Sequence, residues 1–295
     1  RDDVESRGLG DVYKRQCMES GKYEDAVKAF QNALGESIGH IGEKELDICF
    51  YKAKAQALDG KTKDALATYN AIIKYNKDAR AYYLRGDLYM DMGEEKKGRA
   101  DFESAVQQGK KNYEIYIGIY ESLSRHEKKD EGQKYLSAAM EIKGDKPEDE
   151  LYKGRISYLL GENKDAISYL EKAKEHKQML ASYYLGLAYD ANGDSDKAKK
   201  CIAEYIKSGV ATSYDLYELG MQEMQDGNYK NALTYFNSGL ELEKVPNKQN
   251  LMKSAIAAYE YSGDFDSAKK MMKEYLKAYP DDEEAKHENT FLETR

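Results

Sequence analysis

The sequence contains no tryptophan, only three prolines and only three cysteines among its 295 residues. So few prolines exclude a loop-rich β-protein or a disordered linker protein. Cys17, Cys49 and Cys201 lie far apart and show no CxxC or Cys/His ligand spacing, which disfavours a disulfide framework and a zinc site. No stretch approaches 18 consecutive apolar residues, so the sequence predicts no transmembrane segment.

The charge balance and the scarce histidines exclude further classes of function. Forty-six basic residues against 54 acidic ones give a net charge of -8, which disfavours binding to nucleic acid. The four histidines, His40, His126, His176 and His287, are scattered, and the sequence has no HExxH motif, nucleophile elbow or P-loop. We therefore expect a protein that is not an enzyme and has no catalytic residues, metal or cofactor.

The first sixteen residues differ in character from the rest of the chain. Residues 11–16 read Asp-Val-Tyr-Lys-Arg-Gln and resemble one translated frame of the transposon-end sequence used in DNA sequencing libraries. We interpret residues 1–16 as a non-native segment that contributes little to the core, the alternative being a genuine N-terminal tail. On the first interpretation the native start, with any targeting signal, is missing. The sequence then leaves open a cytoplasmic protein and an extracytoplasmic, lipid-anchored one.

A repeat of about 34 residues runs through the remainder of the chain. A turn glycine is followed five residues later by a small residue and four residues after that by a bulky one. The glycine tolerates a left-handed turn, the small residue lets two helices approach closely, and the bulky residue fills the gap against the neighbouring repeat. In the fourth repeat, which carries one extra residue, His126, Glu131 and Tyr135 take the three positions. The turn glycines are Gly21, Gly60, Gly93, Gly161, Gly193, Gly227 and Gly263.

The helix before each turn carries a signature of its own, as in Leu185-Gly186-x-x-Tyr189 and Arg85-Gly86-x-x-Tyr89. Together with the small-x₃-bulky pattern, this resembles the tetratricopeptide repeat, although the tryptophan of that family is absent. The resemblance covers residues 17 to about 280. It implies an all-α, right-handed α-solenoid of about eight helix–turn–helix repeats and about fifteen helices, with the first repeat incomplete.

The same resemblance gives the expected organisation of the chain. The array is expected over 17–280, followed by an acidic capping helix over 281–295, a stretch with a net charge of -4. The expected repeats are about 17–45, 46–78, 79–110, 111–146, 147–178, 179–212, 213–248 and 249–280.

The resemblance further implies that the first helix of each repeat lines a concave face. Aromatic, methionine and charged side chains recur there, and such side chains suit an extended or helical peptide. The alternative is that many of them pack between repeats. The predicted groove residues are Phe50, Lys54, Tyr83, Asp87, Met90, Ile119, Arg155, Tyr158, Tyr183, Tyr217, Met221 and Met224.

We therefore expect a non-catalytic scaffold that binds a protein or peptide in this groove. One alternative is a bacterial cell-envelope protein whose lipid anchor is missing from this sequence, and a remoter one is a helical repeat that binds nucleic acid. The carboxylate clamp with which some relatives hold chaperone tails is disfavoured, because asparagine is missing from these positions and Lys54 and Arg155 lie three repeats apart. The identity of the partner and the oligomeric state stay open.

Overall fold

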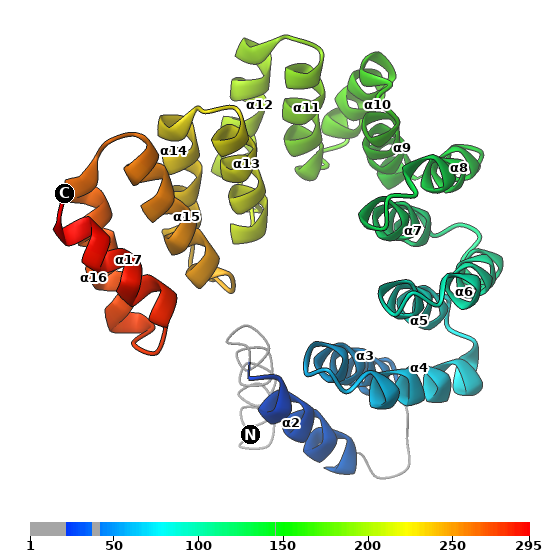
Figure 1. The fold of residues 1–295 in the computed structure, drawn as a ribbon. Helices are drawn as coiled ribbons and strands as arrows, with labels where there is room; N and C mark the ends of the chain where they lie inside the picture. Colours follow the sequence, from blue (N-terminus) through cyan, green and yellow to red (C-terminus); the bar gives the residue numbers. More distant parts are fainter. Residues whose placement is uncertain (1–21, 37–41, 145) are drawn as a thin grey trace, which may run out of the picture. The chain divides into compact units, whose positions relative to one another are not determined.

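The computed structural model describes residues 22–36, 42–144 and 146–295, so the expectations for residues 1–16 and for the turn at Gly21 lie outside the described residues. The described residues form sixteen α-helices and no β-strand (Figure 1). Within these ranges, none of the helices combines the length and the apolarity that a bilayer crossing requires. The prediction of an all-α helical repeat protein is confirmed.

The chain divides into two compact units, Arg1–Tyr205 and Ile206–Arg295. In the first unit the described helices are α2 (Tyr23–Glu36), α3 (Glu43–Leu58), α4 (Thr62–Asn76), α5 (Ala79–Asp91), α6 (Glu95–Gln108), α7 (Tyr113–Arg125), α8 (Lys129–Met140), α9 (Pro147–Leu160), α10 (Asn163–Glu175), α11 (Leu180–Ala191) and most of α12 (Ser195–Lys207). In the second unit they are α13 (Ser213–Gln225), α14 (Tyr229–Leu240), α15 (Lys248–Tyr261), α16 (Phe265–Ala278) and α17 (Glu283–Glu293).

Tight turns join the helices into packed pairs, such as α5 with α6, α9 with α10 and α13 with α14. All six turn glycines that lie in the described residues have a φ between 73° and 84°. This left-handed conformation is costly for a residue with a Cβ, which explains why glycine recurs there. The turn prediction is confirmed at Gly60, Gly93, Gly161, Gly193, Gly227 and Gly263.

The fourth repeat keeps the same register with different residues. The left-handed residue is Glu127, with a φ of 60°. Five residues later Gly132 lies against the backbone of Tyr120, and four residues after that Leu136 is completely buried. The assignment of His126, Glu131 and Tyr135 to these three positions was therefore wrong by one residue. Burial fixes the register here, because Leu136 is inside the core whereas Tyr135 is half-exposed.

In several repeats the bulky residue of the second helix packs onto a glycine in the first helix of its own pair. Phe102, Leu170 and Phe236 are completely buried. Each lies against a glycine of the preceding helix, Gly86, Gly154 and Gly220 respectively, where an added Cβ would collide with the bulky side chain. The leucine–glycine signature of the first helices thus marks the points at which a ring or branched side chain rests on bare backbone.

The last helix, α17, covers the α15–α16 pair with a small apolar face and a polar anchor. Ala285 and Leu292 are buried in the same cluster as Met272 and Tyr275. Asp282 caps the start of α17 by accepting a hydrogen bond from the backbone N–H of Ala285 at 3.0 Å. The hydroxyl of Tyr275 donates to the same carboxylate. These contacts tie the end of the chain to the core of the second unit.

Candidate functional site

Ion pairs link first helices that are one repeat apart in the first unit. The guanidinium of an arginine on one helix reaches an acidic side chain on the preceding first helix. These contacts connect α3, α5, α7 and α9 in series, and the charges that take part in them are neutralised within the chain. We call them the first-helix ion pairs: Arg80–Asp47 at 2.8 Å, Arg125–Asp87 at 2.6 Å, and Arg155–Glu121 at 3.0 Å with Glu114 at 3.4 Å.

These ion pairs occupy two of the charged residues that the sequence assigned to a groove. The side chain of Arg155 is only 18% exposed, and its guanidinium also lies 5.5 Å from the ring centre of Tyr184. Asp87 is 20% exposed and engaged by Arg125. Lys54, in contrast, is exposed, and no carboxylate of the described residues pairs with it. A partner would have to displace internal contacts to use Asp87 or Arg155, but not to use Lys54.

Three of the predicted groove residues are core residues. Phe50 is 6% exposed, Met90 2% and Ile119 0%. The guanidinium of Arg80, from the next repeat, lies 3.7 Å from the ring centre of Phe50 and covers it. The sulfur of Met90 packs against Gly98 of its own pair. For these three, the alternative of packing within and between repeats describes the structure, and their side chains offer no surface to a partner.

Three predicted tyrosines of the first unit are half-buried. The ring of Tyr83 lies 6.3 Å from that of Phe102 and touches Gly118 of the next repeat. Burial, and secondly the nearby Asp87, raise the pKa of Tyr83 well above its usual range. Tyr158 packs against the α9–α11 cluster, and Tyr183 lies 5.3 Å from the ring centre of Tyr205. These rings join neighbouring helices and expose only part of their surface.

The second unit presents a more open apolar surface on α13. Tyr217, Met221 and Met224 are half-buried and pack against the cluster around Phe236. Tyr214 lies on the same face, because the spacings of three, four and three residues return to one side of a helix, and it is 54% exposed. We call Tyr214, Tyr217, Met221 and Met224 the α13 strip. Sequence reasoning missed Tyr214, although its place three residues before Tyr217 is the signal that could have found it.

The charged residues of α13 itself all have one sign. The helix carries Asp215, Glu218 and Glu223 and contains no lysine or arginine. From the neighbouring helix α15, the hydroxyl of Ser254 donates a hydrogen bond to the sulfur of Met221 at 3.6 Å. The α13 strip is therefore an aromatic and methionine surface with acidic flanks.

Metal ligation and thiol chemistry are two activities that the described residues allow to be examined. Among them, no group of three or more His, Cys, Asp or Glu side chains is placed to hold a metal ion. Burial raises the pKa of the Cys49 thiol and that of the Cys201 thiol. A thiol with a raised pKa holds little thiolate at neutral pH, so neither is an activated nucleophile.

This geometry, a stack of glycine-turned helix pairs with small and bulky residues in a fixed register, defines a helical repeat protein. Profiles described as "Tetratricopeptide repeat" match the sequence in four places. One profile matches residues 18–74 and 52–113, and another matches 180–208 and 249–282, so that together they cover more than half of the chain. The chain belongs to the tetratricopeptide repeat family. No curated protein matches its sequence.

Several solved structures are similar to the chain in fold. A tetratricopeptide repeat protein from Parabacteroides merdae has 12% sequence identity and a TM-score of 0.49, over 86% of this chain and 99% of that one. PilW, a type IV pilus biogenesis factor, has 17% identity and a TM-score of 0.45, over 71% and 97%. The Cut9–Hcn1 assembly of the APC/C also has 17% identity and a TM-score of 0.45, over 92% and 52%.

Proposed function

We propose that the chain is a protein-interaction scaffold and that its partner docks on the α13 strip of the second unit. Tetratricopeptide repeats commonly mediate protein–protein interactions and generally serve as non-catalytic scaffolds. Of the predicted groove residues, Tyr217, Met221 and Met224 belong to this strip, and Lys54, Tyr83, Tyr158 and Tyr183 are secondary candidates in the first unit.

The observation that carries this proposal is the exposure of Tyr214 beside two half-buried methionines. Aromatic side chains dominate the energetics of protein interfaces, and methionine adapts its shape to different apolar partners. Tyr214 is 54% exposed and shares a helix face with Met221 and Met224, whereas the other exposed large apolar residues of the second unit, Val210, Tyr261 and Phe291, lie outside α13. Because the flanks of α13 are acidic, the partner segment that fits best presents apolar side chains with lysine or arginine beside them.

A matched pair of exposed tyrosines provides the test. Tyr214 on the first helix α13 is 54% exposed, and Tyr75 on the second helix α4 is 56% exposed. A photo-crosslinking phenylalanine analogue is placed at each position in the native host, and captured proteins are identified by mass spectrometry. We expect position 214, and not position 75, to capture a specific partner protein.

The captured partner then allows a quantitative measurement. Tyr214→Ala and Met221→Ala are expected to weaken its binding, by about 30-fold for an anchor residue worth about 2 kcal/mol. Tyr75→Ala controls for the loss of an equally exposed ring. Unchanged affinity in both α13 variants, with melting temperatures equal to that of the parent, would contradict the proposal.

A further inference from the structure

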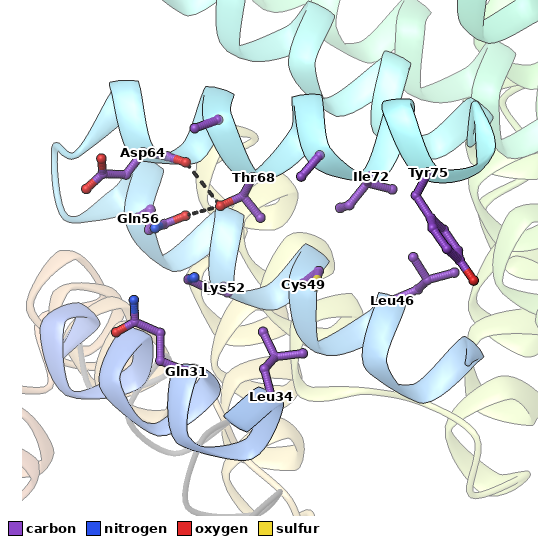
Figure 2. A pocket seen from close by; sticks show the side chains of 12 residues that line it. Gln31, Leu34, Leu46, Cys49, Lys52, Gln56, Asp64, Thr68, Ile72 and Tyr75 are labelled. Carbon is purple, nitrogen blue, oxygen red and sulfur yellow. Dashed lines mark hydrogen bonds between the residues drawn. The ribbon is translucent and has the colours of Figure 1, made fainter. Parts of the chain in front are cut away.

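A pocket of about 510 Å³ lies among α2, α3 and α4 of the first unit. Its wall residues include no member of the first-helix ion pairs and none of the predicted groove residues. Figure 2 shows α3 between the other two helices, with side chains from all three directed into the space. The volume falls in the range of about 300–1,000 Å³ that is typical of small-molecule sites.

The helices around this pocket are held in place by packing elsewhere. Ala26 and Phe30 of α2 are buried together with Ile48 and Ala55 of α3. The ring of Phe30 stacks on that of Tyr51 with 6.0 Å between the ring centres. Because these contacts fix α2 against α3, the pocket exists before any ligand binds.

The two ends of the pocket differ in polarity. At one end lie Leu46, Ile72 and Tyr75, which present aliphatic and aromatic surface (Figure 2). At the other end lie Gln56 and Thr68, whose side chains are hydrogen-bonded to each other. A ligand that fills this space therefore needs an apolar body and a polar end.

The polar end offers hydrogen-bond donors. Gln56 is only 5% exposed, and its Oε1 accepts a hydrogen bond from the hydroxyl of Thr68 at 2.8 Å. Gln56 lines the pocket, and no acceptor in the described part of the chain pairs with its Nε2. A ligand oxygen can accept from this amide N–H₂ without displacing an internal contact.

The polar end also carries an unpaired cation. Lys52 lines the pocket, is half-buried, and forms no ion pair with any carboxylate of the described residues. Asp64 lies at the same end, but it is exposed and sits in the first turn of α4, near the positive end of the helix dipole. Lys52 is the more buried of the two charges, so water and salt screen it less.

We propose that this pocket binds a small amphipathic monocarboxylate, such as a medium-chain fatty acid. The carboxylate accepts hydrogen bonds from Nε2 of Gln56 and Nζ of Lys52, and the hydrocarbon chain lies along Leu46, Ile72 and Tyr75. A cationic ligand would face Lys52 directly, and a purely apolar one would leave both donors unpaired. This site is separate from the α13 strip and does not depend on the proposed scaffold function.

Cys49 supplies a reporter for this site, because its half-exposed thiol lies on the pocket wall between the two ends (Figure 2). The full chain with Cys17→Ser and Cys201→Ala leaves Cys49 as its single thiol. Its rate of alkylation by a maleimide is measured with decanoate, decan-1-ol or decylamine, each below its micelle-forming concentration. We expect saturable protection by decanoate, with at least tenfold higher affinity than for the other two probes.

Two substitutions separate the carboxylate contact from the apolar one. Lys52→Met is expected to weaken decanoate binding by about tenfold and to leave decanol binding unchanged. Lys54→Met removes an exposed charge of the same helix from outside the pocket and should change neither. Ala71→Phe, which fills the pocket from an exposed position on α4, should abolish protection by every probe. Equal protection by decanoate and decanol, or none by decanoate, would overturn the proposal.

Discussion

Phe102 of α6 rests directly on the backbone of Gly86 in α5: a Cβ at position 86 would lie 2.8 Å from Cδ1 of the ring. Since Phe102 is completely buried and cannot swing aside, we expect Gly86→Ala to destabilise the first unit. Overpacking lowers the free energy of unfolding by about 1–3 kcal/mol. The better helix propensity of alanine offsets only up to about 1 kcal/mol of that loss.

Urea unfolding of the parent and of Gly86→Ala measures this cost. Gly35→Ala is a suitable control, because Gly35 also lies in a helix, α2, and an added Cβ there meets nothing within 4 Å. The control should be neutral or slightly stabilising. Equal stability of Gly86→Ala and Gly35→Ala would show that the contact between Phe102 and Gly86 does not restrict position 86.

Glu127 occupies the left-handed turn position that glycine takes in the other described repeats. A residue with a Cβ pays about 1–2 kcal/mol for this conformation, whereas glycine adopts it readily. We expect Glu127→Gly to raise the free energy of unfolding by about 1 kcal/mol, as measured by urea titration. Lys134→Gly, at an exposed position inside α8, should instead lower the free energy of unfolding. Glycine in the interior of a helix costs about 1 kcal/mol.

Arg85 and Asp101 form a bidentate ion pair between α5 and α6, with distances of 2.7 Å from Nε and 2.6 Å from Nη2 to the two carboxylate oxygens. Asp101 is only 6% exposed. We expect Arg85→Met to destabilise by about 3–5 kcal/mol, because it leaves a buried carboxylate without its cation. Arg85→Met combined with Asp101→Leu should recover most of that loss.

A double-mutant cycle by urea unfolding measures this coupling. Lys28→Met serves as the comparison, because the Lys28–Glu24 pair is 63% and 61% exposed and solvent screens such a pair strongly. If Arg85→Met were as mild as Lys28→Met, the ion pair would not be the reason for the burial of Asp101.

The stability of the second unit is expected to fall in acid because of Asp282. Hydrogen bonds from Tyr275 and Lys253 hold the pKa of this carboxyl well below its usual range. A group whose pKa is lower in the folded state stabilises the fold above its unfolded pKa, about 3.9 for aspartate. This contribution is lost as the pH falls below about 4 towards the folded-state pKa.

Thermal unfolding at pH 7 and at pH 3 tests this expectation. Asp282→Asn should lower the melting temperature at pH 7, and its difference from the parent should shrink at pH 3. Glu284→Gln, in which the carboxylate is 89% exposed and lies 3.3 Å from Lys253, should have a much smaller effect. If the melting temperatures of Asp282→Asn and the parent differed by the same amount at both pH values, the charge of Asp282 would not be what stabilises the second unit.

The sequence predicted the fold well because the turn glycines are a backbone requirement that shows in the residue type itself. The register slipped only in the fourth repeat, where Glu127 adopts the left-handed conformation without being glycine. The local sequence carries a signal that was passed over: five residues after Glu127 stands the small residue Gly132, whereas five residues after His126 stands Glu131, which is not small. The buried Leu136 settles the register, and its burial is a property of the folded structure.

The candidate site was harder to predict, because equivalent positions differ in what covers them. Phe50 and Tyr217 both lie three residues before the small residue of a first helix. Arg80, from the following repeat, lies over Phe50, and Phe50 is buried, whereas Tyr217 is half-buried. Such a cover comes from a side chain 30 residues away, so periodicity within one repeat cannot reveal it.

The first-helix ion pairs also bear on how such an array can gain or lose whole repeats during evolution. Asp87, Glu121 and Arg155 occupy equivalent places in α5, α7 and α9, because each lies six residues before the left-handed residue of its turn, Gly93, Glu127 and Gly161 respectively. Deleting the α7–α8 pair would set Arg155 against Asp87, and opposite charges would meet at the new joint. Deleting the α5–α6 pair would instead set Arg125 against Lys54, the equivalent of Asp87 in α3, and like charges would meet. The order of these repeats is therefore constrained: the array can be shortened at one joint and resists shortening at the one before it.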